Sequence, residues 1–261
     1  MHSSFLYDVH VHLTDAEYAG YTDHIVASLR AMRIVACSVS VDVASSRRGL
    51  ELFGRHRDAV RQFVGIHPEF AARESVDEFS ELARANEDMI DGIGEIGLDG
   101  TYESERGVPY GKQKQVFSAM LSVAESLRKP VSIHSRRALD DILDMLPSYK
   151  IESALLHWFA GSKKQLARSM DMGLYVSYGP ALVYSEDKKV LLRNTRQDRF
   201  LVETDGPVRY PRCFEGRPAL PTSFLASVVA SAAHTLRQTF EETAATLERN
   251  SQAFLAATTG T

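Results

Sequence analysis

Eight short apolar runs, alternating with longer amphipathic stretches, constrain the fold of this 261-residue chain more than any other feature. The runs are rich in β-branched residues and apolar at consecutive positions, which is typical of strands buried on both faces of a parallel sheet. They cover Phe5–Val9, Ile34–Val39, Gln62–Ile66, Gly92–Ile96, Pro130–Ile133, Ala154–Leu156, Leu174–Ser177 and Phe200–Val202.

The stretches between these runs have helical periodicity. In Gln113–Leu127 the apolar residues recur at the i, i+3, i+4, i+7, i+8 spacing of one helix face. Ser75 with Glu78, and Thr239 with Glu242, have the spacing of capping boxes at helix starts. The remaining predicted helices are Val43–His56, Asp77–Ala85, Arg137–Met145, Lys163–Met172, Asp187–Arg193, Pro221–Leu236 and Phe240–Ala256.

Strands that alternate with helices predict βαβ units throughout the chain. Eight strands and a length near ~250 residues match a closed (β/α)8 barrel of the TIM type. A doubly wound open sheet is the structural alternative, and the strand count favours the barrel. No Pro/Gly/Ser-rich linker divides the sequence, so we expect a single domain over residues 1–261.

Composition narrows the functional classes. With 44% hydrophobic and 25% charged residues, the chain reads as a soluble globular protein without a membrane span. Its two cysteines, Cys37 and Cys213, argue against a disulfide framework and favour a reducing, cytoplasmic compartment. The first residues lack the pattern of a signal peptide, so we expect none. The net charge of −4 excludes a broad basic surface for nucleic acid.

Polar residues gather where the predicted strands end, which is where (β/α)8 barrels place their catalytic groups. Five of the nine histidines and three acidic residues stand at or just after strand ends. The candidate site residues among them are His10, His12, His67, Glu95, His134, His157 and Asp205. His10 and His12 are two apart on a strand, so both side chains point to the same face. Imidazole and carboxylate groups that converge at one edge of a sheet predict a divalent-metal site at the C-terminal ends of the strands.

Each of these residues also has an ordinary structural explanation when taken alone. A His-x-His pair is more often found on a surface, Glu95 could pair with an arginine, and Asp205 could cap the turn before Gly206 and Pro207. Arg136 could bind a phosphate or pair with an acidic neighbour. Trp158 is better explained by packing than by base stacking. The order and spacing of the whole set carry the metal-site prediction.

These residues lie in motifs that resemble those of the TatD-like metal-dependent hydrolases, a branch of the amidohydrolase superfamily. In chain order the motifs are Asp8-Val9-His10-Val11-His12-Leu13, Gly65-Ile66-His67-Pro68, Gly94-Glu95-Ile96-Gly97-Leu98-Asp99, Pro130-Val131-Ser132-Ile133-His134-Ser135-Arg136, His157-Trp158-Phe159-Ala160-Gly161, Glu203-Thr204-Asp205-Gly206-Pro207, and Asn250 ahead of Phe254. The resemblance therefore runs from residue 8 to residue 254.

The resemblance implies a barrel that holds two divalent ions, of zinc, manganese or magnesium. The implied ligands are His10, His12 and Asp205 for the first ion, His134 and His157 for the second, and Glu95 as a bridge between them. Asp205 and Glu95 would be the catalytic residues, with Asp205 taking a proton from the attacking water. His67 and Arg136 would lie near the substrate.

The resemblance also implies a nuclease that cleaves DNA, on single strands or from 3′ ends. The alternatives on the same metal core are hydrolysis of an aminoacyl ester, a lactone or a small phosphoester, or a metal-stabilised subunit without turnover. The loops at residues 178–187 and 209–218 depart from the family pattern. Arg209, Arg212 and Arg217 in the second loop could reach a phosphate backbone.

Overall fold

The computed structural model describes residues 4–210, 212 and 221–256. The chain forms two compact units. The first unit comprises Met1–Ser38, His56–Arg61 and Trp158–Ala253, and the second comprises Val39–Arg55, Gln62–His157 and Phe254–Thr261. Cys213 and Arg217, and most of the loop at 209–218, lie outside the described residues.

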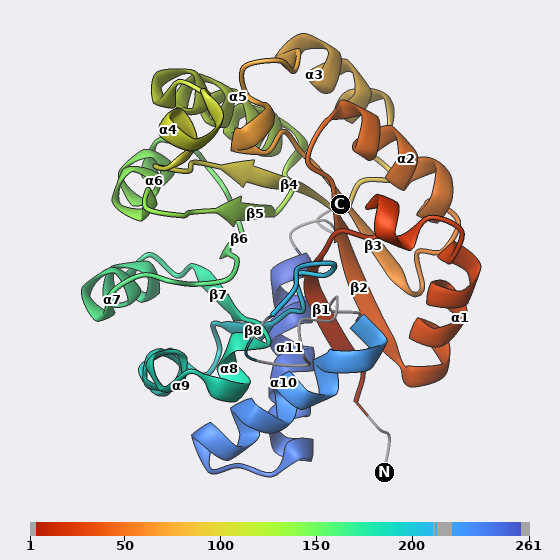
Figure 1. Cartoon of the computed structure of the whole chain (residues 1–261), viewed down its shortest axis with the longest axis vertical. Helices are drawn as coiled ribbons and strands as arrows, with labels where there is room; N and C mark the ends of the chain where they lie inside the picture. The colour runs from red at the N-terminus through yellow and green to blue at the C-terminus, as the bar shows by residue number, and fades with distance from the viewer. Residues whose placement is uncertain (1–3, 211, 213–220, 257–261) are drawn as a thin grey trace. The chain divides into compact units, whose positions relative to one another are not determined.

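Eight strands make one sheet, and their order in the sheet is their order in the chain. The registered strand pairs are parallel. A doubly wound sheet reverses its strand order at a switch point, so the sequential order excludes it. The chain has the predicted (β/α)8 fold (Figure 1), with β1 Leu6–Val11, β2 Ile34–Val39, β3 Val60–Val64, β4 Gly92–Gly97, β5 Val131–His134, β6 Ala154–Leu156, β7 Tyr175–Tyr178 and β8 Phe200–Val202.

Helices connect the strands, and the predicted helices are present. They are α1 Thr22–Met32, α2 Val43–Phe53, α3 Val76–Ala85, α4 Tyr102–Arg106, α5 Tyr110–Leu127, α6 Leu139–Met145, α7 Lys163–Asp171, α8 Ala181–Tyr184, α9 Glu186–Arg193, α10 Pro221–Leu236 and α11 Phe240–Leu255. The sequence pattern does not predict α1, α4 or α8. The helix α1 buries Ile25, Val26 and Leu29, a short stripe within a polar stretch.

In the first unit, α10 packs against α8 and α9 (Figure 1). The C-terminal helix α11 is tied to the start of β8 by Asn250. Its amide Nδ2 donates to the carbonyl oxygens of Gln197 at 2.8 Å and Phe200 at 2.9 Å. These two hydrogen bonds join α11 to the segment that enters β8, the strand that leads to Asp205.

In the second unit, the backbone of β4 runs close to its neighbours. A Cβ atom at Gly92 would lie 2.1 Å from the Phe63 ring, and one at Gly97 would lie 2.1 Å from the carbonyl oxygen of His134. Gly97 also has a φ of +142°, which is strained for any residue with a side chain. Glycine at these positions lets β4 approach β3 and β5 closely and places Glu95 beside the end of β5.

Candidate metal centre

The first unit brings three of the predicted ligands together where β1 and β8 end. The Nε2 atoms of His10 and His12 lie 3.7 Å and 3.4 Å from Asp205 Oδ1. The backbone locks the two strand ends to each other, because Asp205 N–H donates to the His10 carbonyl at 2.9 Å and His12 N–H donates to the Gly206 carbonyl at 2.8 Å. His10 and Asp205 are buried, so the group is largely shielded from water.

Asp205 has a φ of +53°, in the left-handed region that residues other than glycine seldom occupy. Such backbone strain persists only where the surroundings hold it, and it gathers at functional sites. Here the residue before it is held by a buried carboxylate: both the N–H and the hydroxyl of Thr204 donate to Asp8. Burial raises the pKa of Asp8 to about 7.

The second unit gathers three imidazoles around one carboxylate oxygen, Oε1 of Glu95. His157 Nε2 lies 2.8 Å from it, His134 Nδ1 lies 3.0 Å from it, and His67 Nε2 lies 3.6 Å from it. Glu95 is 3% exposed, so this oxygen faces imidazole nitrogens in place of water. His67, which the resemblance places near the substrate, belongs to the same cluster but lies farther from Glu95 than the two predicted ligands.

Asp99 contacts the His134 ring on the side away from Glu95, and this contact is not among those expected from the sequence. Its Oδ2 lies 2.8 Å from His134 Nε2, while its other oxygen accepts from the N–H and hydroxyl of Thr101. Burial alone would raise the pKa of Asp99, but the hydrogen bonds from His134 and Thr101 outweigh it and lower that pKa to about 2. Burial would lower the pKa of His134, but its hydrogen bonds with Asp99 and Glu95 outweigh burial and raise that pKa. The Gly97-Leu98-Asp99 sequence at the end of β4 is the sequence feature that could have predicted this contact.

The His–Asp cluster of the first unit and the His–Glu cluster of the second unit both have donor atoms that suit a divalent ion. His10, His12 and Asp205 each offer a ligand atom within 4.8 Å of the others, and so do His67, Glu95 and His134. Imidazole nitrogen combined with carboxylate oxygen is a ligand set suited to Zn²⁺, Mn²⁺ or Fe²⁺. The predicted gathering of polar residues at strand ends therefore produces, in each unit, a cluster able to hold a metal.

Comparison with known families agrees with this geometry. The family model described as TatD related DNase matches residues 7–256. The chain belongs to the TatD family. It is accordingly a metal-dependent hydrolase, as the resemblance implied.

Several TatD relatives have been described. The chain is 28% identical to the Bacillus subtilis protein named uncharacterized metal-dependent hydrolase YabD, over 95% of this chain and 97% of that one. It is 30% identical to the Salmonella typhimurium protein named 3′-5′ ssDNA/RNA exonuclease TatD, over 82% and 83%. The crystal structure of the Escherichia coli TatD homolog YjjV superposes with a TM-score of 0.86 at 20% identity, covering 95% and 97%, and shows the shared fold.

Around the TatD clusters, several charged residues have structural partners. Arg136 Nη1 lies 3.3 Å from Glu105 Oε2 and 4.0 Å from Asp99 Oδ2. Of the two roles that the sequence allows for Arg136, it therefore has the pairing with acidic neighbours. Its side chain is 51% exposed, which keeps it accessible to a ligand. In the described part of loop 209–218, Arg209 pairs with Glu17 at 2.8 Å.

Glu203 and Trp158 shape the loop after β6. The buried Glu203 carboxylate accepts from the Trp158 N–H at 2.8 Å and from the Ser177 hydroxyl at 2.6 Å. The Trp158 ring lies 5.4 Å from the ring of Tyr210 and packs on the same small core as Tyr184. These contacts agree with the expectation that Trp158 serves packing.

Within the residues that the structure describes, no helix is long and apolar enough to cross a membrane.

Proposed function

We propose that this TatD-family hydrolase is a deoxyribonuclease that removes nucleotides from the 3′ ends of single strands, using two divalent ions. The observation that carries the proposal is the pair of buried imidazole–carboxylate clusters at strand ends, one in each unit. Two-ion sites of this chemistry suit phosphodiester hydrolysis, because the reaction needs a hydroxide near neutral pH and compensation of phosphoryl charge. The relative from Pantoea ananatis named 3′-5′ ssDNA/RNA exonuclease TatD, 28% identical, supports the same substrate class.

The proposal gives each clustered residue a role. Divalent ions, when bound, lower the pKa of a water molecule and neutralise charge on phosphate oxygens. His10 and His12 would ligate through Nε2, the nitrogen that faces Asp205. Asp205, 4% exposed, would ligate beside them and accept the proton of the attacking water. Its fixed backbone keeps the carboxylate in place for that transfer.

In the second unit, the Glu95 carboxylate would ligate and bridge the ions. Its Oε1 atom lies beside the imidazoles of His134 and His157. His67 would contribute either to the ion or to the substrate from the same cluster. Arg136, exposed at the edge of this cluster, would bind a phosphate oxygen in competition with its pairing to Glu105.

The bridging role is tested by counting metal. Glu95→Gln keeps the shape of the side chain and removes its charge, so we expect occupancy to fall from two ions per chain towards one. Elemental analysis of the purified protein after dialysis against Mn²⁺ gives the number. Two ions retained in the variant would contradict the bridging role.

The substrate is tested with oligonucleotides labelled at either end, as single strands and duplexes, together with RNA and an aminoacyl ester. We expect mononucleotides to be released from the 3′ end of the single strand. Turnover should fall steeply as NaCl is added, because phosphate contacts release counterions. Ester turnover that is indifferent to salt, without cleavage of any strand, would replace the nuclease proposal by an esterase. Inactivity with Mn²⁺, Mg²⁺, Zn²⁺ and Co²⁺ on all substrates would indicate a non-catalytic subunit.

A further inference from the structure

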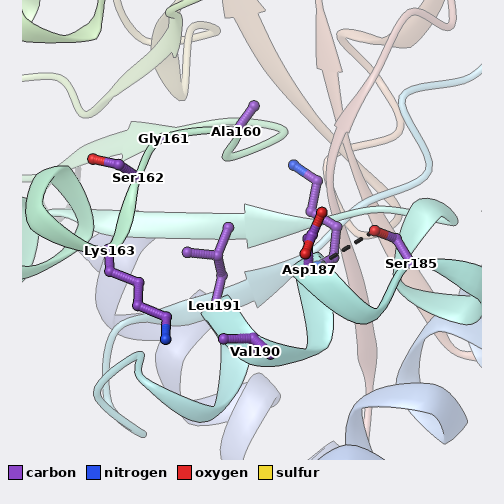
Figure 2. Close-up of a pocket in the computed structure, with 9 residues that line it drawn as sticks. Ala160, Gly161, Ser162, Lys163, Ser185, Asp187, Val190 and Leu191 are labelled. Carbon is purple, nitrogen blue, oxygen red and sulfur yellow. Dashed lines mark hydrogen bonds between the residues drawn. The ribbon is translucent and has the colours of Figure 1, made fainter.

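A cavity of about 440 Å³ lies in the first unit between the β6–α7 loop and the helix α9 (Figure 2). A volume of this order is typical of sites for small ligands. Figure 2 shows one wall formed by the loop and the start of α7 and the other formed by α9 and its N-cap. The residues that line it are Ala160, Gly161, Ser162, Lys163, Ser185, Asp187, Lys188, Val190 and Leu191.

One lysine of this cavity, Lys188, is half-buried. The ammonium group of Lys188 donates to the carbonyl oxygen of Phe159 in the loop opposite. Among the described residues this carbonyl is the hydrogen-bond acceptor it reaches, and an ammonium has three N–H groups to offer. Glu203 and Asp187 compensate part of the Lys188 charge, and the N–H groups of the ammonium beyond the one given to Phe159 are donors that suit an anionic ligand in the cavity.

The second lysine, Lys163, stands at the first position of α7. A cation at a helix N-terminus is unfavourable, because the positive end of the helix dipole lies there. Yet α7 has no acidic residue in its first turn. Helix stability therefore does not explain Lys163, whereas an anion bound beside it would be favoured by both the lysine and the helix.

Asp187 is the acidic residue of the lining, and it has a role of its own. It lies in the first turn of α9 together with Glu186, where negative charge stabilises that helix. The hydroxyls of Ser162 and Ser185 cap α7 and α9. The charged residues of the lining are thus two lysines and one aspartate. Their summed formal charge is positive, although the net charge of the chain is −4.

The cavity is also linked to a predicted metal ligand within the same unit. The carboxylate of Glu203 holds the N–H of Trp158, the residue before Phe159. Two residues after Glu203 comes Asp205. The loop that forms one wall of the cavity is therefore fixed to the strand end that carries the proposed proton acceptor, which suits a contact with the same substrate.

We propose that Lys163 and Lys188 form a phosphate subsite in this cavity that binds a phosphodiester group of a single-stranded nucleic acid substrate. The inference rests on the proposed nuclease function and adds to it a position where the strand is held away from the bond that is cut. It predicts that the two lysines contribute to binding of the strand and leave the hydrolytic step unchanged.

The test compares two double variants that each remove two positive charges from the same two helices. Lys163→Gln with Lys188→Met empties the cavity of its cations, and methionine retains the apolar stem of Lys188. Lys164→Gln with Lys189→Gln is the matched control, since neither residue lines the cavity. The probe is a ten-nucleotide oligo-dT with a 5′ fluorophore, and its anisotropy is measured in EDTA so that the strand is bound without being cut.

We expect the cavity variant to bind the oligonucleotide about 10-fold more weakly and the control to stay within about twofold. The slope of log affinity against log salt should fall by about 0.7 for a lost single-strand phosphate contact. Inorganic phosphate should compete with the strand on the control and not on the cavity variant. With metal present, the cavity variant should show a raised KM and a kcat within about twofold of the parent chain.

Equal weakening in both double variants would mean a general charge effect and would overturn the subsite. Unchanged binding in the cavity variant, with strand cleavage intact, would overturn the subsite and leave the nuclease function standing. Binding that depends on the two lysines, without cleavage of any strand, would support the subsite and overturn the nuclease function. The single change Lys163→Gln, at an exposed position, provides the same comparison if the double variant does not fold.

Discussion

At the scale of single residues, the bond between Asp99 and His134 decides which imidazole nitrogen is available to a metal. The low pKa of Asp99 keeps its carboxylate ionised, so His134 donates from Nε2, 2.8 Å away. Nδ1 is then the nitrogen that faces Glu95, at 3.0 Å. A carboxylate behind a ligating histidine fixes the ring and its tautomer.

Asp99→Asn is therefore expected to weaken metal binding by about 10-fold to 100-fold, because the amide no longer fixes that tautomer. Competition between the protein and a chromophoric chelator for Zn²⁺ measures the change. Asp141→Asn, which alters an exposed aspartate paired with Lys114, is the control and should leave the affinity unchanged. An Asp99→Asn affinity within twofold of the parent would contradict the orienting role.

Lys188 gives a second prediction at this scale. Burial lowers its pKa to about 8, although Glu203 and Asp187 act in the opposite direction. Between this pKa and the ordinary value near 10.5, the unfolded chain binds more protons than the folded one, so stability rises with pH. Relative to Lys188→Met, the parent chain should gain roughly 2–3 kcal/mol between pH 7 and pH 10.5. Urea unfolding of both proteins measures it, and a constant difference would refute the pKa shift.

The clustered residues were predictable because their types follow apolar runs, and parallel strands bring such positions to one edge. What the sequence could not supply is which atoms meet. The position of Asp99 on His134, the approach of His67 to Glu95 and the hold of Glu203 on Trp158 depend on side-chain rotamers. Those rotamers are set by packing with residues distant in sequence.

At the scale of elements, β4 depends on glycine. A side chain at Gly97 would meet the His134 carbonyl and would have to adopt a φ of +142°. Gly97→Ala should lower the free energy of unfolding by about 3 kcal/mol or more, because both overpacking and backbone strain act there. Gly111→Ala is the matched control, since that helical position is open and alanine is the better helix former by about 1 kcal/mol. Urea unfolding in which Gly97→Ala is no less stable than the control would contradict this reading.

Element boundaries show where sequence patterns stop being informative. Long stripes such as that of α5 predicted helices, since many positions agree on one face. The short helices α4 and α8 have five and four residues, too few to establish a period. The capping box predicted at Thr239 is present, because its hydrogen bonds with Glu242 are local.

At the scale of the whole molecule, the sequential order of the strands is the feature that identifies the fold. Eight parallel strands in chain order require a crossover helix between neighbours, and the alternation in sequence predicted it. The single domain expected over residues 1–261 stays a prediction. The net charge of −4 does not oppose a phosphate substrate, because divalent ions held by the clusters would make the local charge positive.

Metal binding should also be visible in the stability of the whole chain. An ion that binds the folded state alone stabilises it by about 2.7 kcal/mol at a concentration 100 times its Kd. For a chain of this size that corresponds to a rise in Tm of roughly 5–10 °C. Differential scanning fluorimetry with and without Mn²⁺ after EDTA treatment measures it. An unchanged Tm would mean that the clusters do not bind the ion.

The most direct test of the central claim is the release of mononucleotides from a single-stranded oligonucleotide by protein stripped with EDTA and then supplied with Mn²⁺. We expect no release before Mn²⁺ is added and release from the 3′ end afterwards. In Asp205→Asn, which lacks the proposed proton acceptor, we expect turnover to fall by about 10²-fold to 10⁴-fold. Release without metal, or equal release by Asp205→Asn, would contradict the central claim.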